Sequence, residues 1–462
     1  MFDKKIYIER RNRLKKDVDS GVILFLGNEE SPSNYPDIHF PFRQDSSFLY
    51  FFGLDFPSLY AVIDIDSGSE TVFGNDPSVE TIVWTGTQPT LKSKCQKIGI
   101  AHTAPLDRLT DVLQKAIKQK RRIHFLPPYR PEHLITLEKL LGIHNSIVAG
   151  KASVELIKAV AAQRSIKSEA EIGEINKAVE IIYQMQMAAF KNSRPGKYEM
   201  EIAGLMEGIA ISMGGALAFT TIFSIHGQTL HNPYYFNRMK KGDMAVNDSG
   251  AEADMHYASD ITRTIPIGGK FSSRQREIYQ LVYNAQITAI KAVKPGVKFR
   301  DIHVLACTKL AEGLKEVGLM KGNINEAVAE GAHALFFQCG LGHMLGLDVH
   351  DMEGLGEDYV GYTDIIKRNP QFGLRSLRLA KELQPGFLIT IEPGIYLIPE
   401  LIDLWKKQNK LSQYINYKMV EKYRDFGGIR IEDDILVTET GCKNLSAKIP
   451  KKIDDVEKLA GD

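Results

Sequence analysis

The sequence predicts an α/β protein with two domains, the second of which contains two related halves. Three observations predict this class. Short apolar runs alternate with helical stretches over the first 155 residues, two amphipathic helix pairs recur a hundred positions apart, and each pair precedes strand-like sequence carrying a carboxylate. Interleaved strands and helices are typical of α/β domains. We therefore expect one domain over residues 1–155 and another over 156–462.

The first domain is expected to hold a small sheet with helices beside it. Short apolar runs bounded by turns predict strands, and longer stretches with helical spacing predict helices. No glycine-rich loop of the kind that binds phosphate accompanies these runs. The predicted strands are Val22–Leu26, Leu59–Ile65, Thr81–Trp84 and Arg122–Leu126, and the predicted helix is Asp107–Lys118.

The second domain opens with a strong helix signal. Ser168 and Glu171 form a capping box, in which each side chain satisfies a backbone N–H of the other residue. This helix is expected to end near Pro195-Gly196, and a second to end at Gly214. The same order of helix, Pro-Gly and helix returns later in the chain. The other predicted helices are Glu199–Met213, 273–294 and Asp301–Val317.

The carboxylates of the two halves also correspond. Asp248 lies six residues after Gly242, and Glu392 lies six residues after Gly386. Chance similarity between two amphipathic helix pairs is the alternative, but it does not account for the matched acidic positions. We infer two halves, each with two helices and an antiparallel sheet, packed about a pseudo-twofold axis with a cleft between the sheets.

Composition excludes several classes of protein. The 462 residues are 44% hydrophobic and 25% charged, and the formal net charge is +1. A near-neutral chain has no global field to attract nucleic acid or an anionic membrane. The four cysteines are widely spaced, and no apolar signal core follows Met1. We expect a cytoplasmic protein that binds neither nucleic acid nor membrane.

Asp248 and Asp260 form the first candidate site. Asp248 ends one apolar strand and Asp260 opens the next, so a hairpin would bring the two carboxylates together. Such pairs are usually turn residues or solvated ion pairs. Here both flank apolar runs, which favours burial, and buried carboxylates need a cation or shared protons.

Two histidines seven residues apart form the second candidate site. His343 and His350 lie in a glycine-rich apolar segment. A lone histidine there is more often a core residue with a satisfied hydrogen bond. His343 suits a metal ligand, because imidazole binds divalent first-row metals. His350 suits a proton carrier or a hydrogen-bond donor to substrate.

Glu392, Arg430 and Glu432 complete the set. Arg430 and Glu432 are two apart and therefore share one face of a strand. The structural interpretation of this pair is an exposed ion pair. In the functional interpretation, Glu432 binds a metal ion, and Arg430 binds the substrate backbone or neutralises acidic charge. Four carboxylates and one imidazole make a hard site, which suits Mn²⁺, Co²⁺, Fe²⁺ or Zn²⁺. Bridging carboxylates can hold two ions about 3.5–4 Å apart, with an acidified water between them.

These residues resemble a known family. Together with His231, they look like the creatinase/methionine aminopeptidase superfamily of pita-bread metallopeptidases. The stretches Ser259–Thr264, Gly342–Asp351 and Ile429–Asp434 are similar to aminopeptidase P, and Pro41–Phe48 with Tyr50 and Gly53 resembles the creatinase-like amino-terminal domain of these enzymes. The resemblance covers nearly the whole chain. It implies a pita-bread catalytic domain and hydrolysis of the bond between an amino-terminal residue and a following proline.

The resemblance also implies roles for single residues. His231 and His350 would contact substrate, Arg430 would organise the site, and Glu392 would also act as general base. Manganese is the expected metal, substrates would be peptides with proline second, and a homodimer or homotetramer is expected. The implied ligands of two divalent ions are Asp248, Asp260, His343, Glu392 and Glu432, with Asp260 and Glu432 bridging.

Three features depart from the family pattern. Asp248 and Asp260 are 12 residues apart, one more than usual, so we expect a bulge in the hairpin. Cys339 stands where many relatives have a histidine near the substrate. Long inserts over 357–382 and 400–425 are expected to form oligomer contacts or a rim over the cleft.

Other functions compete with the aminopeptidase. A prolidase would use the same metal residues but would accept only Xaa-Pro dipeptides. A noncatalytic binding module of the same fold should have lost metal ligands, and a metal-free creatinase-like hydrolase would not need the acidic set. A tripeptide beginning Xaa-Pro separates the first two enzymes, and metal content tests the binding module.

Overall fold

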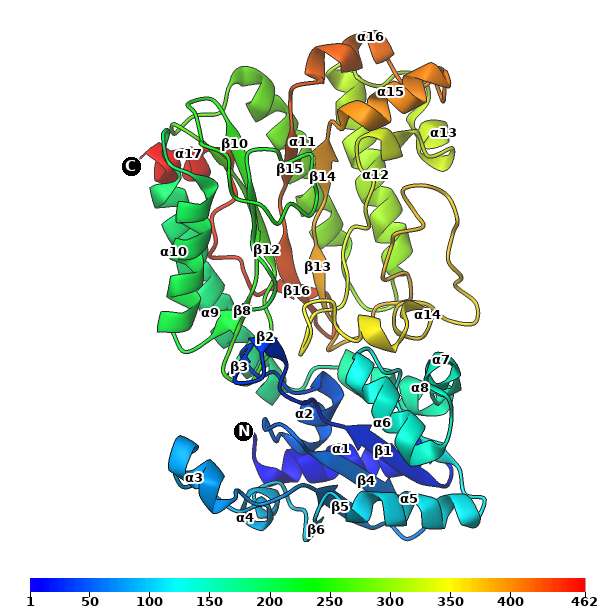
Figure 1. Ribbon diagram of the computed structural model, residues 1–462. Helices are drawn as coiled ribbons and strands as arrows, with labels where there is room; N and C mark the ends of the chain where they lie inside the picture. Colours follow the sequence, from blue (N-terminus) through cyan, green and yellow to red (C-terminus); the bar gives the residue numbers. More distant parts are fainter. Residues whose placement is uncertain (462) are drawn as a thin grey trace. The chain divides into compact units, whose positions relative to one another are not determined.

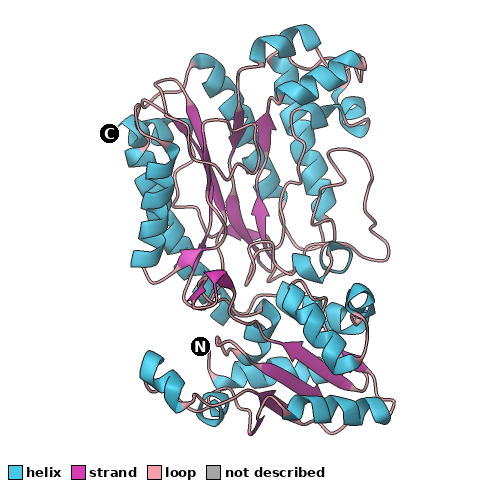
Figure 2. Cartoon of the chain, in the orientation of Figure 1, coloured by secondary structure: helices cyan, strands magenta, loops and turns pink. Residues whose placement is uncertain are grey.

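A computed structural model describes residues 1–461 and divides into two compact units (Figures 1 and 2). Unit 1 contains Met1–Arg164 together with Gly354–Tyr359. Unit 2 contains Ser165–Glu353 and the chain from Val360 onward. Within residues 1–461, no helix is both long enough and apolar enough to cross a membrane.

Unit 1 is built on a five-stranded mixed sheet. Strand β1 (Val22–Leu26) lies inside the sheet, antiparallel to β4 (Tyr60–Asp64) and parallel to β7 (Ile123–His124). The sheet order is β6-β5-β4-β1-β7, with β5 at Glu70–Phe73 and β6 at His102–Ala104. The helices are α1 (Lys4–Asp17), α2 (Ser46–Phe52), α3 (Val79–Thr85), α4 (Leu91–Gln96), α5 (Arg108–Lys118), α6 (Pro131–Leu141), α7 (Asn145–Val148) and α8 (Val154–Ser165), and a hairpin of β2 (Pro32–Tyr35) and β3 (Ile38–His39) completes the unit.

Most of the predicted elements of unit 1 are confirmed, and one is wrong. Strands β1 and β4 and helix α5 lie where the sequence predicts them, whereas β7 is shorter than predicted. Thr81–Trp84, predicted as a strand, lies in helix α3. The Ser78 side chain caps this helix by accepting a hydrogen bond from the Thr81 backbone N–H. Val83 and Trp84 are largely exposed, so no sheet buries this apolar run, and capping decides its conformation.

Unit 2 repeats one arrangement. Helices α9 (Glu169–Asn192) and α10 (Glu199–Ser212) precede a sheet of β12-β10-β9, and helices α11 (Ser273–Ala292) and α12 (Phe299–Glu316) precede a sheet of β13-β16-β17. Figure 1 shows the central strands with the helix pairs outside them. The first-half strands are β8 (Ala216–Leu217), β9 (Ile222–Ser224), β10 (Met244–Ser249), β11 (Ala251–Glu252) and β12 (Ile261–Pro266); the second-half strands are β13 (Leu388–Ile391), β14 (Gly394–Tyr396), β15 (Gly428–Arg430), β16 (Asp433–Val437) and β17 (Cys442–Asn444).

The four long helices of unit 2 confirm the sequence prediction. The capping box of Ser168 and Glu171 is present at α9, and Ser272 and Gln275 form its counterpart at α11. Both helices bury an apolar face with period near 3.6 residues. The remaining helices of the unit are short and follow the second pair: α13 (Ile324–Ala329), η2 (Ala332–Leu335), α15 (Pro399–Lys407), α16 (Tyr417–Val420), η4 (Glu421–Tyr423) and α17 (Ile453–Gly461). Most of η3 (Glu353–Leu355) and α14 (Glu357–Val360) falls in the segment that belongs to unit 1.

Candidate active site

A hairpin places the first two carboxylates. Strands β10 and β12 are antiparallel, with Asp248 opposite Thr262. Asp248 is the penultimate residue of β10, and Asp260 immediately precedes β12. The predicted bulge is wrong for these strands, because their register runs unbroken over all six described pairs. The longer spacing is taken up in the turn, where His256 adopts a left-handed backbone conformation with φ of 64°.

The second half repeats this geometry. Strands β13 and β16 are antiparallel, and Glu392 directly follows β13 while Glu432 directly precedes β16. The two halves meet at Thr262. Its carbonyl accepts a hydrogen bond from the Glu432 N–H at 3.1 Å, and its hydroxyl donates to Oε2 of Glu432 at 2.7 Å. One residue of β12 therefore fixes both the backbone and the carboxylate of Glu432.

A loop against β13 orients His343. Its backbone N–H donates to the Thr390 hydroxyl at 3.1 Å, and its Nδ1 lies 3.0 Å from the Met344 carbonyl. A Cβ on Gly342 would lie 2.0 Å from the Thr390 carbonyl oxygen, so only glycine permits this approach. Because Nδ1 is held by a carbonyl, Nε2 is left facing Asp260 and Glu392, whose nearest oxygens are each 3.5 Å away.

All eight predicted site residues line one cavity of about 530 Å³ in unit 2. Apolar side chains share the wall with them, and two residues of the first long insert also contribute. The predicted residues are His231, Asp248, Asp260, His343, His350, Glu392, Arg430 and Glu432; Phe219, Leu230 and Val349 are apolar neighbours, and Ser376 and Arg378 come from the insert.

The carboxylates crowd together in a buried place. Ligand atoms of Asp260, His343 and Glu432 all lie within 4.8 Å of one another. Burial, followed by repulsion from Glu432 and Asp248, raises the pKa of Asp260, and burial with repulsion from Glu392 and Asp248 raises that of Glu432. Burial lowers the pKa of His343, which keeps its imidazole neutral and able to donate a lone pair.

The donor set fits a cation. Oδ1 of Asp248 and Oδ1 of Asp260 are buried and accept no hydrogen bond from any residue that the structure describes. Arg430 places a guanidinium against these carboxylates, with its Nη2 2.5 Å from Oδ2 of Asp248. One positive charge cannot balance four buried carboxylates. Bound metal ions would supply the remaining positive charge.

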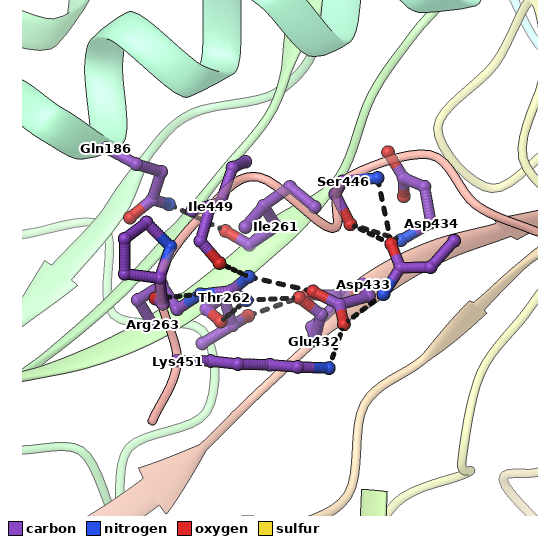
Figure 3. Close-up of polar contacts among 12 residues, drawn as sticks. Gln186, Ile261, Thr262, Arg263, Glu432, Asp433, Asp434, Ser446, Ile449 and Lys451 are labelled. Carbon is purple, nitrogen blue, oxygen red and sulfur yellow. Dashed lines mark hydrogen bonds and ion pairs between the residues drawn. The ribbon is translucent and has the colours of Figure 1, made fainter. Parts of the chain in front are cut away.

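A buried polar network supports the strand that carries Glu432 (Figure 3). Arg263 donates from Nη1 to the Glu432 carbonyl at 2.5 Å and from Nη2 to Asp433 at 2.8 Å. Lys451 also pairs with Asp433. In Figure 3 these side chains converge behind Glu432, so the network fixes the backbone from which that carboxylate projects.

Sequence reasoning missed a second network, which includes two residues that line the cavity. Nδ1 of His350 lies 2.5 Å from Oε2 of Glu353, and Arg378 donates to the same oxygen from Nε at 3.2 Å. The hydrogen bond from His350, together with Arg378, lowers the pKa of Glu353 to about 2 against the effect of burial. The spacing of Glu353 three residues after His350 was the available signal; nothing in the sequence marked Arg378, which lies within an insert.

His231 and Cys339 lie at the cavity with different surroundings. Partial burial lowers the pKa of His231, and Asp248 opposes that effect. Burial raises the pKa of the Cys339 thiol to about 12, and the negative charge of Glu392 adds to the increase. Cys339 is therefore a neutral thiol in the cavity wall.

Comparisons with known proteins agree with this fold and site. Residues 173–439 match the model of metallopeptidase family M24, and residues 7–124 match the aminopeptidase P amino-terminal domain. The chain is 30% identical to the human Xaa-Pro dipeptidase over 96% of its own length and 90% of that protein. It is also 30% identical to a probable Xaa-Pro aminopeptidase of Uncinocarpus reesii, over 95% of this chain and 90% of the relative.

A solved structure of zinc-substituted Escherichia coli aminopeptidase P in complex with product superposes with a TM-score of 0.81. The two chains are 27% identical, and the match covers 99% of this chain and 98% of that one. A fold of paired helices and sheets around a carboxylate-rich cavity defines a pita-bread metallopeptidase. This chain belongs to metallopeptidase family M24.

Proposed function

We propose that this chain is a metal-dependent Xaa-Pro aminopeptidase, which hydrolyses the bond between an amino-terminal residue and a following proline. The observation that carries the proposal is the convergence of four carboxylates and one neutral imidazole on one cavity. The match of residues 173–439 to a metallopeptidase family supports it, as do relatives named Xaa-Pro aminopeptidase.

Two divalent metal ions are proposed to bind this cavity. The orphaned oxygens of Asp248 and Asp260 and the free Nε2 of His343 are the donors that such ions would use. Asp260 comes from the first half and Glu432 from the second, so both would hold the ions where the two sheets meet. An oxygen-rich set suits manganese. The proposed ligands are Asp248, Asp260, His343, Glu392 and Glu432.

The protein's own residues would bind and protonate the substrate. The bound ions would acidify a water molecule and polarise the scissile carbonyl. Glu392, whose pKa burial raises, can take the proton of the attacking water and pass it to the leaving nitrogen. His231 and His350 would donate hydrogen bonds to the substrate and the tetrahedral intermediate. Arg430 holds Asp248 in place and offsets part of the acidic charge.

Proline in the second position fits the composition of the cavity wall. Proline has no amide hydrogen to donate, so a site that accepts it must bind the ring by apolar contact. Phe219, Leu230 and Val349 provide apolar surface in the same cavity as the carboxylates. This wall supports a specificity for proline without a hydrogen bond to the backbone nitrogen.

A prolidase is the second candidate, because the human Xaa-Pro dipeptidase is 30% identical over 96% of this chain. Both enzymes need the same metal residues. They differ in whether the cavity accepts residues after proline. A noncatalytic binding module is disfavoured, because all five proposed ligands are present and line one cavity.

Peptide cleavage by manganese-loaded protein tests the proposal. We expect release of the first residue from Xaa-Pro-Xaa peptides, and little release from matched Xaa-Ala-Xaa peptides. Cleavage of Xaa-Pro dipeptides alone would favour the prolidase. Absence of cleavage in protein shown by elemental analysis to hold two metal ions would refute both enzymes.

We further propose that the protein works in the cytoplasm as a homodimer or homotetramer. The four cysteines are free in the structure, as a reducing compartment would leave them. Sedimentation of the metal-loaded protein measures the subunit number.

A further inference from the structure

A cluster of three metal-binding side chains lies outside the catalytic cavity. His303 and Cys307 are four residues apart in α12 and therefore lie on the same face of that helix. His333 comes from the short helix η2. Ligand atoms of the three residues all lie within 4.8 Å of one another, and Sγ of Cys307 is 3.4 Å from Nε2 of His303. None of the three is among the described residues that line the cavity.

The imidazoles of this cluster are buried without ordinary hydrogen bonds. His303 is 0% exposed and His333 is 2% exposed. Nδ1 of His303 and both ring nitrogens of His333 form no hydrogen bond of regular geometry with any described residue. Burial lowers the pKa of His303 to about 3 and of His333 to about 4, against weak support from the Gly373 and Val328 backbones. Both rings are neutral, so each has a lone pair to offer.

A hydrogen bond between the Cys307 thiol and His303 is the simplest alternative. It accounts for the 3.4 Å contact, but it leaves the His333 ring buried with the Val328 backbone as a partner for one nitrogen and no described partner for the other. Buried polar groups in folded proteins nearly always have a partner, so an unused imidazole nitrogen on this ring requires an explanation. Among residues 1–461, the aromatic ring that packs against His303 is Phe337, with its centroid 5.7 Å away, and it offers no acceptor.

We propose that His303, Cys307 and His333 bind a metal ion of the zinc class at a structural site distinct from the catalytic centre. One soft thiolate and two borderline imidazoles suit zinc and its spectroscopic substitute cobalt. They contrast with the oxygen-rich catalytic set, which suits manganese. Binding converts the Cys307 thiol to a thiolate, and its proton leaves to solvent.

The position of the cluster gives this ion a structural role. Helix η2 runs into Phe336 and Phe337, and Gln338, Cys339 and Gly340 of the cavity wall follow directly. The Phe336 carbonyl accepts a hydrogen bond from the Tyr396 N–H at 2.8 Å, which ties this segment to β14. An ion that joins His333 to α12 would fix the start of this wall segment against the helix.

Cobalt reports a thiolate ligand directly, because thiolate-to-cobalt charge transfer gives near-ultraviolet absorption that carboxylate and imidazole ligands do not produce. The full-length protein is produced in zinc-depleted, cobalt-supplemented medium, so that the ion enters while the chain folds. We expect the absorption band in the wild-type protein. We expect Cys307→Ala to lose the band and one cobalt ion per chain, with unchanged far-ultraviolet circular dichroism.

Cys339→Ala is the matched control, because Cys339 is the thiol in the catalytic cavity. The band should persist in Cys339→Ala and in Asp260→Ala, a variant that loses a proposed catalytic ligand. If Cys307→Ala folds poorly, His333→Gln takes its place, with the same expected loss of one ion. Absence of the band from the wild-type protein, its persistence in Cys307→Ala, or its loss in Cys339→Ala would each overturn the proposal. A catalytic failure alone would leave this band unchanged, so the two proposals fail separately.

Discussion

At the scale of single residues, Glu353 shows how a neighbouring carboxylate can set the orientation of an imidazole in the proposed active site. It holds Nδ1 of His350 at 2.5 Å, and the His350 ring lies 4.2 Å from that of His343, centroid to centroid. A carboxylate that accepts a hydrogen bond from one ring nitrogen of a histidine fixes the direction in which the other ring nitrogen points. Glu353 is therefore a positioning residue, whereas His350 is proposed to touch substrate.

Glu353→Gln should lower kcat about 10-fold to 100-fold, the usual cost of losing such a partner. The amide keeps the shape of the side chain but weakens the bond to His350 and releases Arg378. KM and metal content should change little, which separates loss of orientation from loss of folding. Steady-state kinetics on an Xaa-Pro-Xaa peptide, with the exposed Glu439→Gln as control, measure the effect. Unchanged kcat would show that His350 does not depend on Glu353.

Asp64 and Arg121 form a charge pair in unit 1 whose contribution depends on pH. Arg121 donates to both oxygens of Asp64, at 2.8 Å and 2.6 Å. These hydrogen bonds lower the pKa of Asp64 below its ordinary value, despite partial burial. Because the folded pKa is depressed, the stabilisation is present above the unfolded pKa of about 3.9 and disappears as pH falls through the folded value.

Asp64→Asn should lower the unfolding free energy of unit 1 at pH 7 by on the order of 1 kcal/mol, the contribution of a bidentate pair that is partly solvent-exposed. This loss should appear as a lower Tm. The difference in Tm between this variant and the wild type should shrink as pH falls below about 4, where the unfolded carboxyl takes up a proton. Thermal unfolding followed at several pH values tests this dependence. A difference that grows toward acid pH would reverse the assigned sign.

At the scale of helices and strands, the two capping boxes mark the start of each half of unit 2. The Ser168 hydroxyl accepts a hydrogen bond from the Glu171 N–H at 3.4 Å, while Glu171 accepts from the Ser168 N–H at 2.9 Å. Ser168→Ala removes the first of these and should cost about 1 kcal/mol of unfolding free energy. Urea denaturation measures it, with Ser212→Ala at the exposed end of α10 as a control expected to stay within about 0.5 kcal/mol. Equal effects at both positions would argue against a capping contribution at Ser168.

Local sequence predicts the helices of unit 2 better than the short strands of unit 1. Capping residues and apolar periodicity act within one helix, so α9 and α11 follow from the sequence nearly to the residue. The apolar run Thr81–Trp84 shows the limit of this reasoning. Its β-branched and aromatic residues favour a strand, yet the Ser78 cap and the lack of a neighbouring strand leave it helical.

The candidate site was predictable as far as its residues belong to short motifs. Asp248, Asp260 and Glu432 lie at strand ends, where alternation and turn residues reveal them. Arg378 was missed, because an insert of irregular structure carries it to the cavity and no local pattern reports that contact. The cluster of His303, Cys307 and His333 was missed for a similar reason, since His333 comes from η2 and joins two residues of α12 that no local pattern connects to it.

At the scale of unit 2 as a whole, both halves donate carboxylates to one place. Asp248 and Asp260 come from the first half and Glu392 and Glu432 from the second, and Thr262 joins the two sheets. Packing the halves together therefore brings like charges into a buried cavity. Arg430 balances part of this charge. We infer that the catalytic ions also hold the halves together.

Chelation of the catalytic ions should accordingly abolish peptide cleavage and lower the Tm of unit 2 by several degrees. When the free ion concentration is about 100 times the dissociation constant, binding to the folded state alone raises the free energy of unfolding by about 2.7 kcal/mol. Addition of Mn²⁺ should restore both activity and Tm. The cluster of His303, Cys307 and His333 would bind manganese weakly, so recovery with Mn²⁺ assigns the change in Tm to the catalytic site. Asp260→Asn, which keeps the size of the side chain but removes the charge of a proposed ligand, should show no Tm response to chelator or Mn²⁺. A wild-type Tm that is the same with and without metal would mean that direct contacts between β12, β15 and β16, and not the ions, hold the two halves together.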